Sequence, residues 1–88
     1  MAFTIVILPS AQRALQDIPK KQRRQVSEKI DRLTNDPFPQ TSKKLQGIEN
    51  TYRVDSGDYR ILYQVVQRVL TVTVVKIGNR KDVYRNLQ

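Results

Sequence analysis

The period of the apolar and polar positions changes about halfway along the chain. Residues 3–8 are mostly β-branched or aromatic and end at Pro9, which is typical of a β-strand. A first helix is predicted from an N-cap at Ser10 to about Ile18, where Pro19 ends it. The chain is therefore expected to begin as a strand followed by a short helix.

A second helix is predicted over residues 20–35, because apolar side chains recur there at helical spacing, at Val26, Ile30 and Leu33. Its other positions are rich in basic residues: Lys20, Lys21, Arg23, Arg24, Lys29 and Arg32. A solvated helix face explains this pattern, and a surface for RNA or an acidic partner is the functional alternative. Two prolines then predict a loop at 35–39, after which Leu45 is expected to fill part of the core.

From Thr51 onward, apolar and polar residues alternate with the period of strands. Three strands are predicted, at about 51–55, 58–66 and 69–77. Two-residue turns at 56–57 and 67–68 would join them into an antiparallel meander, and residues 82–87 are expected to form a short helix. The expected fold class is α+β, in the order β-α-α-β-β-β: an antiparallel sheet with two helices packed on one face and a short C-terminal helix, forming a single domain over residues 1–88.

The turn expected at 56–57 would place Arg53 directly opposite Arg60, and the second turn would pair Tyr63 with Val72. One face of the sheet is then apolar and must be covered by the helices; it includes Tyr52, Val54, Tyr59, Ile61 and Tyr63. The other face carries the arginines, and like charges opposite each other destabilise a sheet by roughly 0.2–1 kcal/mol. That face is either an ordinary solvated surface with ion pairs or an anion site on rigid strands.

The segment after the last strand adds candidate residues. Gly78 allows the strand to bend, and a helical turn would place Arg80 and Tyr84 on one side because they are four residues apart. An exposed tyrosine among cations suits a stacked nucleotide base. A tyrosine that fills the core is the structural alternative.

Composition limits the chemistry. Sixteen Lys and Arg against eight Asp and Glu give a formal net charge of +8, which favours a polyanionic partner such as nucleic acid, the ribosome or an acidic protein. The chain has no cysteine and no histidine, so disulfides, cysteine metal sites and histidine-based triads are excluded; no metal or cofactor is expected. No apolar run is long enough to span a membrane and the N-terminus lacks a signal peptide's basic region, so a cytoplasmic protein is expected.

Three stretches in combination resemble the RelE/ParE superfamily of toxins from bacterial toxin–antitoxin systems: KLQG at 44–47, YRVDSGDYRILY at 52–63 and VVKIGNRKDVY at 74–84. The superfamily has the β-α-α-β-β-β fold that the periodicity indicates. The chain looks like the RelE branch, whose members are endoribonucleases that cut mRNA in the ribosomal A site and arrest translation. The arginine after G-D-Y, the G-x-Arg motif and the C-terminal tyrosine favour that branch.

The resemblance implies a role for each residue that matches the family pattern. Arg60 corresponds to the arginine that contacts the scissile phosphate, Arg80 to the arginine on the leaving-group side, and Tyr84 to the tyrosine that stacks on the nucleotide. Arg53 matches a basic residue on the neighbouring strand. Further phosphate contacts are expected from three lysines: Lys44, Lys76 and Lys81.

Two positions depart from the pattern. Asp55 stands where many members have a second basic residue, and Asn79 stands where many have histidine. RNA supplies its own nucleophile, the 2′-OH, so the enzyme needs mainly to position the substrate and stabilise charge on the phosphate. Asp55 is then a candidate general base, a role whose loss costs about 10²–10⁴ in rate; alternatively, it only orients the arginines.

The resemblance also implies partners: a cognate antitoxin, with which the toxin would form a hetero-oligomer, and the ribosome carrying mRNA. Two other functions fit the same residues. The first is inhibition of DNA gyrase, as in the ParE branch. The second is a non-catalytic module that binds the ribosome or nucleic acid through its basic surface.

Overall fold

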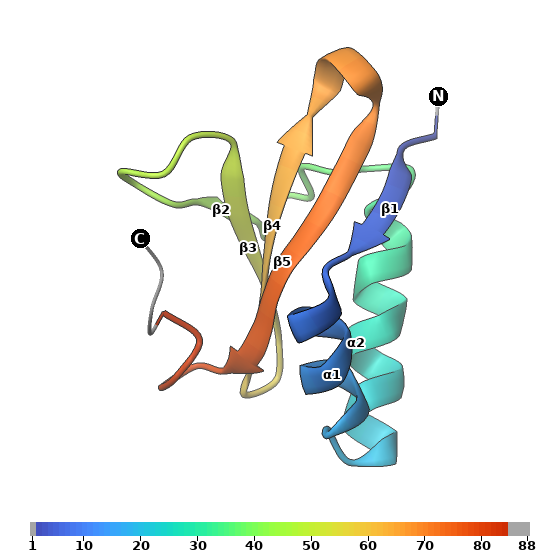
Figure 1. Ribbon diagram of the computed structural model, residues 1–88, viewed down its shortest axis with the longest axis vertical. Helices are drawn as coiled ribbons and strands as arrows, with labels where there is room; N and C mark the ends of the chain where they lie inside the picture. Colours follow the sequence, from blue (N-terminus) through green and yellow to red (C-terminus); the bar gives the residue numbers. More distant parts are fainter. Residues whose placement is uncertain (1, 85–88) are drawn as a thin grey trace.

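The computed structural model describes residues 2–84, in which two helices pack on one face of a five-stranded sheet (Figure 1). The helices are α1 (Pro9–Gln16) and α2 (Lys20–Arg32). The strands are β1 (Thr4–Ile7), β2 (Lys43–Lys44), β3 (Thr51–Ser56), β4 (Tyr59–Val66) and β5 (Thr71–Asn79), and the sheet has the order β1-β5-β4-β3-β2. The α+β class is confirmed, with β2 as an additional short strand.

The first helix starts earlier than predicted, whereas the second starts at Lys20 as expected. Leu8 is the N-cap of α1 and Pro9 occupies its first turn, so the N-cap predicted at Ser10 is wrong. Proline is favoured at this position because its fixed φ suits a helix and its missing N–H would have no partner there anyway. Pro19 likewise precedes α2, which ends at Arg32 rather than at residue 35.

The sheet is antiparallel except at one edge. β1 runs parallel to β5, pairing Thr4 with Thr71 and Ile7 with Val74. β2 forms the other edge, where it pairs with only two residues of β3. Leu45, expected in the core, is half-buried just after β2 and does not belong to the main core cluster.

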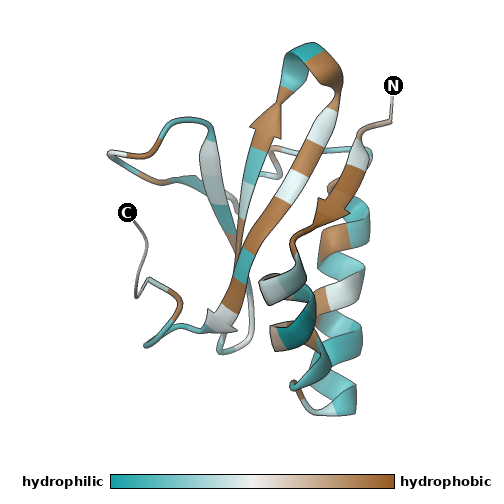
Figure 2. Ribbon diagram, viewed as in Figure 1, coloured by the Kyte–Doolittle hydropathy of each residue, from teal (hydrophilic) through white to brown (hydrophobic). Residues whose placement is uncertain are grey.

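The core lies between the helices and the apolar face of the sheet. It comprises Ala11, Leu15, Ile18, Val26, Ile30, Leu33, Val54, Ile61, Tyr63, Val65, Val72, Val74 and Ile77. Apolar and polar residues alternate along the first half of β5 (Figure 2), so that alternate side chains of this strand reach the core. No helix among residues 2–84 is long and apolar enough to cross a membrane.

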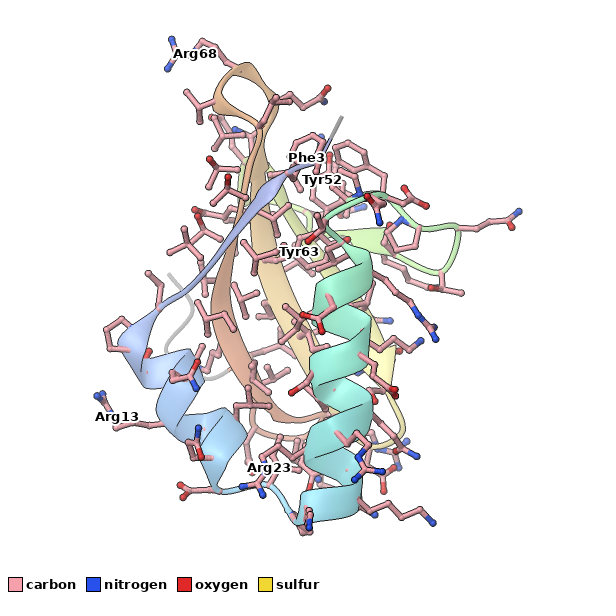
Figure 3. The ribbon with its side chains drawn as sticks, turned by 90° about the vertical axis from the view of Figure 1, so that its right-hand side faces the viewer. Phe3, Arg13, Arg23, Tyr52, Tyr63 and Arg68 are labelled. Atoms are coloured by element: carbon pink, nitrogen blue, oxygen red, sulfur yellow. The ribbon has the colours of Figure 1, made fainter. Side chains whose placement is uncertain are left out.

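An aromatic group closes the core at the C-terminal end of α2 (Figure 3). The rings of Tyr52 and Tyr63 stack at 6.0 Å, and Phe38 meets Tyr52 edge to face at 5.1 Å. The buried Tyr63 hydroxyl donates a 2.8 Å hydrogen bond to the carbonyl oxygen of Pro37, and burial raises the pKa of Tyr63 to about 12. Tyr63 therefore stays a hydrogen-bond donor and fixes the loop after α2 to the sheet.

The β3–β4 turn consists of Gly57 and Asp58, not of Ser56 and Gly57 as predicted. Ser56 pairs with Tyr59. Gly57 has a φ of +60°, whereas Asp58 does not have a positive φ, a pattern that corresponds to a type II′ turn with glycine at its first position. The true register differs from the predicted one by two residues, and because side chains alternate with a period of two, every residue keeps its predicted face.

The β4–β5 connection is also longer than predicted. Val66 pairs with Thr71, and the intervening residues form a 3₁₀ turn (η1, Gln67–Val69) followed by Leu70 in a left-handed conformation. Consequently Tyr63 pairs with Val74 rather than with Val72. This shift, too, is of two residues and preserves the faces.

A β-bulge then reverses the alternation in the second half of β5. Tyr63 pairs with Val74, but Leu62 pairs with Lys76, which leaves Val75 as the extra residue. Beyond the bulge, Ile77 reaches the core, and Lys76 turns to the face away from the helices. Simple alternation from Val74 would have buried the lysine and exposed the isoleucine.

The helix predicted at 82–87 lies only partly within the described residues. Residues 80–84 form a turn in which the backbone N–H groups of Asp82 and Val83 both donate to the carbonyl oxygen of Asn79. Residues 85–87 lie outside the described residues. The turn lies on the side of the sheet away from the helices (Figure 1).

Candidate functional site

The face of the sheet away from the helices carries two arginines with a carboxylate between them. Asp55 on β3 pairs with Arg60 on β4, and Arg53 pairs with Leu62, so the two arginines are diagonal neighbours and not directly opposed. The Oδ1 atom of Asp55 lies 3.6 Å from Nε of Arg53 and 3.4 Å from Nε of Arg60. The like-charge contact expected from the sequence is thus replaced by two ion pairs to one oxygen.

Tyr84 joins the same two arginines at other donors. Its hydroxyl oxygen accepts hydrogen bonds from Nη1 of Arg53 at 2.8 Å and from Nη1 of Arg60 at 3.3 Å. Arg53, Asp55, Arg60 and Tyr84 therefore form a closed ring, here called the arginine–tyrosine cluster. Each guanidinium has five N–H donors, so both Nη2 groups and one Nη1 proton of each arginine are not used within the ring.

Electrostatics reinforces the ring. The hydrogen bond to Tyr84 raises the pKa of Arg53 above its ordinary value, more than partial burial lowers it. Burial alone would raise the pKa of Tyr84, but hydrogen bonds from both arginines and their positive charge outweigh it and lower that pKa. The arginine side chains are 19% and 23% exposed, so they are only partly desolvated and remain within reach of a ligand.

The bulge and Gly78 explain how Tyr84 reaches the arginines. Beyond the bulge, Gly78 pairs with Arg60 on β4, so no side chain of β5 stands beside this arginine. The buried Val83 packs over Gly78 instead, at 3.6–3.7 Å from where a Cβ atom would lie. Since Tyr84 directly follows Val83, this packing holds the phenol next to the cluster.

Two further contacts fix the turn that carries Tyr84. The backbone N–H of Arg80 donates to the carbonyl oxygen of Asp58 at 2.9 Å, which ties the end of β5 to the β3–β4 turn. The side-chain oxygen of Asn79 accepts from the backbone N–H of Lys81 at 3.0 Å. Asn79 therefore has a structural role in shaping the turn.

The structure brings together some of the predicted residues and separates others. The side chain of Arg80 is exposed and forms no hydrogen bond or ion pair within residues 2–84, and Lys81 is exposed as well. Lys76 is half-buried on the same face as the cluster, opposite Leu62. Lys44 pairs with Tyr52 and so belongs to the face that the helices cover.

Lys43 is the basic residue that sequence reasoning missed. It pairs with Arg53 on the neighbouring strand and therefore shares the open face with the cluster. Counting alternate residues outward from β3 would have identified it, but β2 is too short to give a periodic signal of its own. Within the part of the chain that the structure describes, no group of His, Cys, Asp or Glu residues is arranged to hold a metal ion.

Comparisons with known proteins identify a family for the chain. The family model described as the ParE toxin of the type II toxin–antitoxin system parDE matches residues 5–84. A Methanocaldococcus jannaschii protein assigned as a RelE toxin is 29% identical over 89 residues, which span 98% of this chain and 99% of the relative. Toxin RelG of Mycobacterium tuberculosis is 26% identical over 97% of this chain and 99% of its own length.

A solved structure leads to the same assignment. The RelE–RelB complex of Pyrococcus horikoshii is similar with a TM-score of 0.82 and 30% sequence identity, over 94% of this chain and all of the matched chain. The chain therefore belongs to the RelE/ParE superfamily and is a RelE-like toxin of a type II toxin–antitoxin system.

Proposed function

We propose that this toxin is a ribosome-dependent endoribonuclease that cuts mRNA in the ribosomal A site. The observation that carries the proposal is the arginine–tyrosine cluster, in which two adjacent guanidinium groups share a phenol oxygen and keep several N–H donors for a ligand. Paired guanidinium groups on rigid strands match the oxygens of a phosphate, because each can donate two parallel hydrogen bonds. The sequence resemblance to the RelE branch supports the same activity.

Arg60 and Arg53 are the residues to which we assign the scissile phosphate. The 2′-oxygen of the RNA attacks the adjacent phosphorus, the bond to the 5′-oxygen breaks, and a 2′,3′-cyclic phosphate and a 5′-OH result. The 2′-OH loses its proton to solvent and the leaving oxygen gains one. The two guanidinium groups stabilise the negative charge that builds on the phosphorane, an effect worth about 10²–10³ in rate for one well-placed donor.

Tyr84 and Arg80 are assigned to the groups that flank the phosphate. Tyr84 is 38% exposed, so its ring can offer a surface for a stacked base, and such stacking is worth about 1–3 kcal/mol per base. Arg80 has a side chain that no described residue holds, so it is available to the leaving oxygen. An arginine acts there through its charge, because its pKa is too high for it to donate a proton readily.

We also propose that a cognate antitoxin binds this toxin in a hetero-oligomer, with residues 1–88 acting as one domain and with the ribosome and its mRNA as cytoplasmic targets. The solved relatives support the antitoxin, since the Pyrococcus horikoshii RelE was solved together with RelB. An antitoxin would add apolar burial that a chain of 88 residues can supply only in part.

Inhibition of DNA gyrase is the second candidate function. It is favoured by one observation, namely that the matching family model is that of ParE rather than RelE toxins. The ParE function predicts loss of DNA supercoiling without cleavage of mRNA, so the two candidates differ in a directly measurable product.

The test compares the wild-type toxin with Arg60→Ala and with a matched control, Arg68→Ala. Arg68 lies at the tip of the β4–β5 hairpin, at the opposite end of β4 from Arg60 (Figure 3). Primer extension on a translated message should show cuts within A-site codons for the wild type and the control, and a loss of about 10² or more for Arg60→Ala. Equal cutting of naked RNA, or inhibited supercoiling without cleavage, would contradict the proposal.

A further inference from the structure

We propose that Asp55 is an internal competitor of phosphate, which occupies the arginine pair in the free toxin and gives way when a phosphodiester binds. The inference rests on the proposed function, because it takes the arginine pair as the phosphate site. It assigns to Asp55 neither the role of general base nor that of a residue that only orients the arginines.

The position of the carboxylate supports this role. A single oxygen of Asp55 lies between the Nε atoms of Arg53 and Arg60, where an oxygen of a bound phosphate would bridge the same two guanidinium groups. Carboxylate and phosphate are the two anions that the arginine fork binds in the same bidentate manner. Asp55 thus satisfies, from within the chain, donors that a substrate would need.

The ion pairs are loose enough to be exchanged. Their N–O distances of 3.6 and 3.4 Å exceed the roughly 2.7–2.9 Å of a strong charge-assisted hydrogen bond. The side chain of Asp55 is 46% exposed, about twice the exposure of either arginine. Partly exposed ion pairs contribute little free energy, so the carboxylate can leave at small cost while the arginines stay in place.

The structure also offers the displaced carboxylate another location. Asp55 lines a groove of about 290 Å³ between the β3–β4 turn and α2. The opposite wall of the groove contains Lys29 and Arg32, together with one acidic residue, Glu28. A rotation of the Asp55 side chain into this groove would take its carboxylate away from the arginine pair and towards Lys29 and Arg32.

The net charge of the cluster indicates how Asp55 affects the binding of anions. Two arginines and one aspartate give the cluster a formal charge of +1, and replacement of Asp55 by a neutral residue would raise it to +2. Asp55 therefore lowers the affinity of the bare toxin for any polyanion. Contacts made elsewhere, such as those with the ribosome, would then be needed for tight binding of the message.

The experiment measures binding of a short RNA with 2′-O-methyl riboses, which cannot be cleaved, to the purified toxin over a range of salt concentrations. Four proteins are compared: wild type, Asp55→Asn, Asp58→Asn and Arg60→Ala. Asp58→Asn is the matched control, because it removes the same charge from the neighbouring turn and the carboxylate of Asp58 forms no ion pair within the described residues.

The proposal predicts that Asp55→Asn binds the RNA about 3- to 10-fold more tightly than Asp58→Asn does. Asp55→Ala, added as a fifth protein, should bind as tightly as Asp55→Asn, and thermal unfolding would verify that each variant is folded.

Equal affinity of the two asparagine variants would overturn the inference while leaving the proposed function intact, provided that Arg60→Ala still weakens binding. Loss of cleavage by Asp55→Asn without a gain in affinity would also overturn it, in favour of a general base. If Arg60→Ala binds as tightly as the wild type, the phosphate site itself is wrong and the proposed function fails first.

Discussion

The two faces of the central strands are made by alternate residues of the same segments, yet they follow different rules. On the helix-covered face, Ile61 and Tyr63 are fully buried, and the hydroxyl of Tyr63 donates to a backbone oxygen. On the open face, Arg60 stays partly exposed, and the cluster consists of loose ion pairs and a shared phenol oxygen. Packing specifies the first face, and ion pairs and hydrogen bonds organise the cluster on the second.

The difference shows where each kind of residue can be changed. A buried side chain is surrounded by other atoms, so its removal leaves a cavity that the structure fills only in part. A partly exposed charged residue is replaced largely by water, so its removal costs little stability but alters the local charge. Substitutions at neighbouring residues of one strand should therefore differ in effect: those on the buried face should lower stability, and those on the open face should lower activity.

The bulge on β5 gives the sharpest test, because it decides which of two adjacent residues belongs to which face. Ile77→Lys should prevent folding or destabilise the protein by more than about 4 kcal/mol, since it buries an unpaired charge in the core. Lys76→Ala should cost at most about 1 kcal/mol, because Lys76 is on the open face and only half-buried. Chemical denaturation measures both values.

The opposite result would be equally clear. If Lys76→Ala were the damaging change and Ile77→Lys were tolerated, the alternation would continue without a bulge. Gly78 would then no longer face Arg60, and the position of Tyr84 at the cluster would lose its explanation.

A second comparison uses adjacent residues of β4. Ile61→Ala should lower the free energy of unfolding by about 2–5 kcal/mol, because Ile61 is completely buried. Arg60→Ala should lower it by no more than about 1 kcal/mol, since the ion pair that it removes is partly exposed. Urea denaturation measures the two free energies of unfolding. Under conditions in which both variants are folded, Arg60→Ala should lose more mRNA cleavage than Ile61→Ala. A large loss of stability in Arg60→Ala would mean that its lost activity reports unfolding.

Periodicity predicted most of the fold because burial requires it. The strand at the N-terminus, both helices and the three-stranded meander follow from where the apolar residues recur. The helix start at Pro9 was missed, because serine is the more usual N-cap and the proline looked like a break. The parallel pairing of β1 with β5 is a tertiary choice that local sequence does not encode.

The four residues of the arginine–tyrosine cluster were predicted, but the geometry of the cluster was not. The period of two placed Arg53, Asp55 and Arg60 on one face. This assignment remained correct although the β3–β4 turn was misplaced, because the resulting register error was of two residues. The same error hid the position of Asp55 between the arginines. The bulge was missed although the sequence carries a sign of it: Val74 and Val75 are consecutive apolar residues, and unbroken alternation after them would bury Lys76.

The smallest expected effect on stability comes from removing a tyrosine hydroxyl, either that of Tyr63 on the helix-covered face or that of Tyr84 at the open face. Tyr63→Phe should cost about 1–3 kcal/mol, because it leaves the carbonyl oxygen of Pro37 without its buried partner. Tyr84→Phe should cost about 1 kcal/mol or less at neutral pH, because Tyr84 is 38% exposed and water can replace it as an acceptor for the arginines. Chemical denaturation at neutral pH compares the two.

The pKa values of the two tyrosines shift in opposite directions, and an alkaline titration can distinguish them. Burial raises the pKa of Tyr63 to about 12, so its contribution to stability is complete below the ordinary value near 10 and is lost as the pH rises through about 12. The arginines lower the pKa of Tyr84, so its ionisation favours the folded state above pH 10, and this gain disappears as the pH falls through the lowered pKa. The difference in phenolate absorbance between wild type and Tyr84→Phe should therefore show a tyrosine that ionises below pH 10, and Arg60→Ala should move its midpoint upward. A midpoint at or above 10 in the wild type would mean that the phenol does not accept hydrogen bonds from the arginines in solution, and the open face would then lack the ring on which the proposed phosphate site depends.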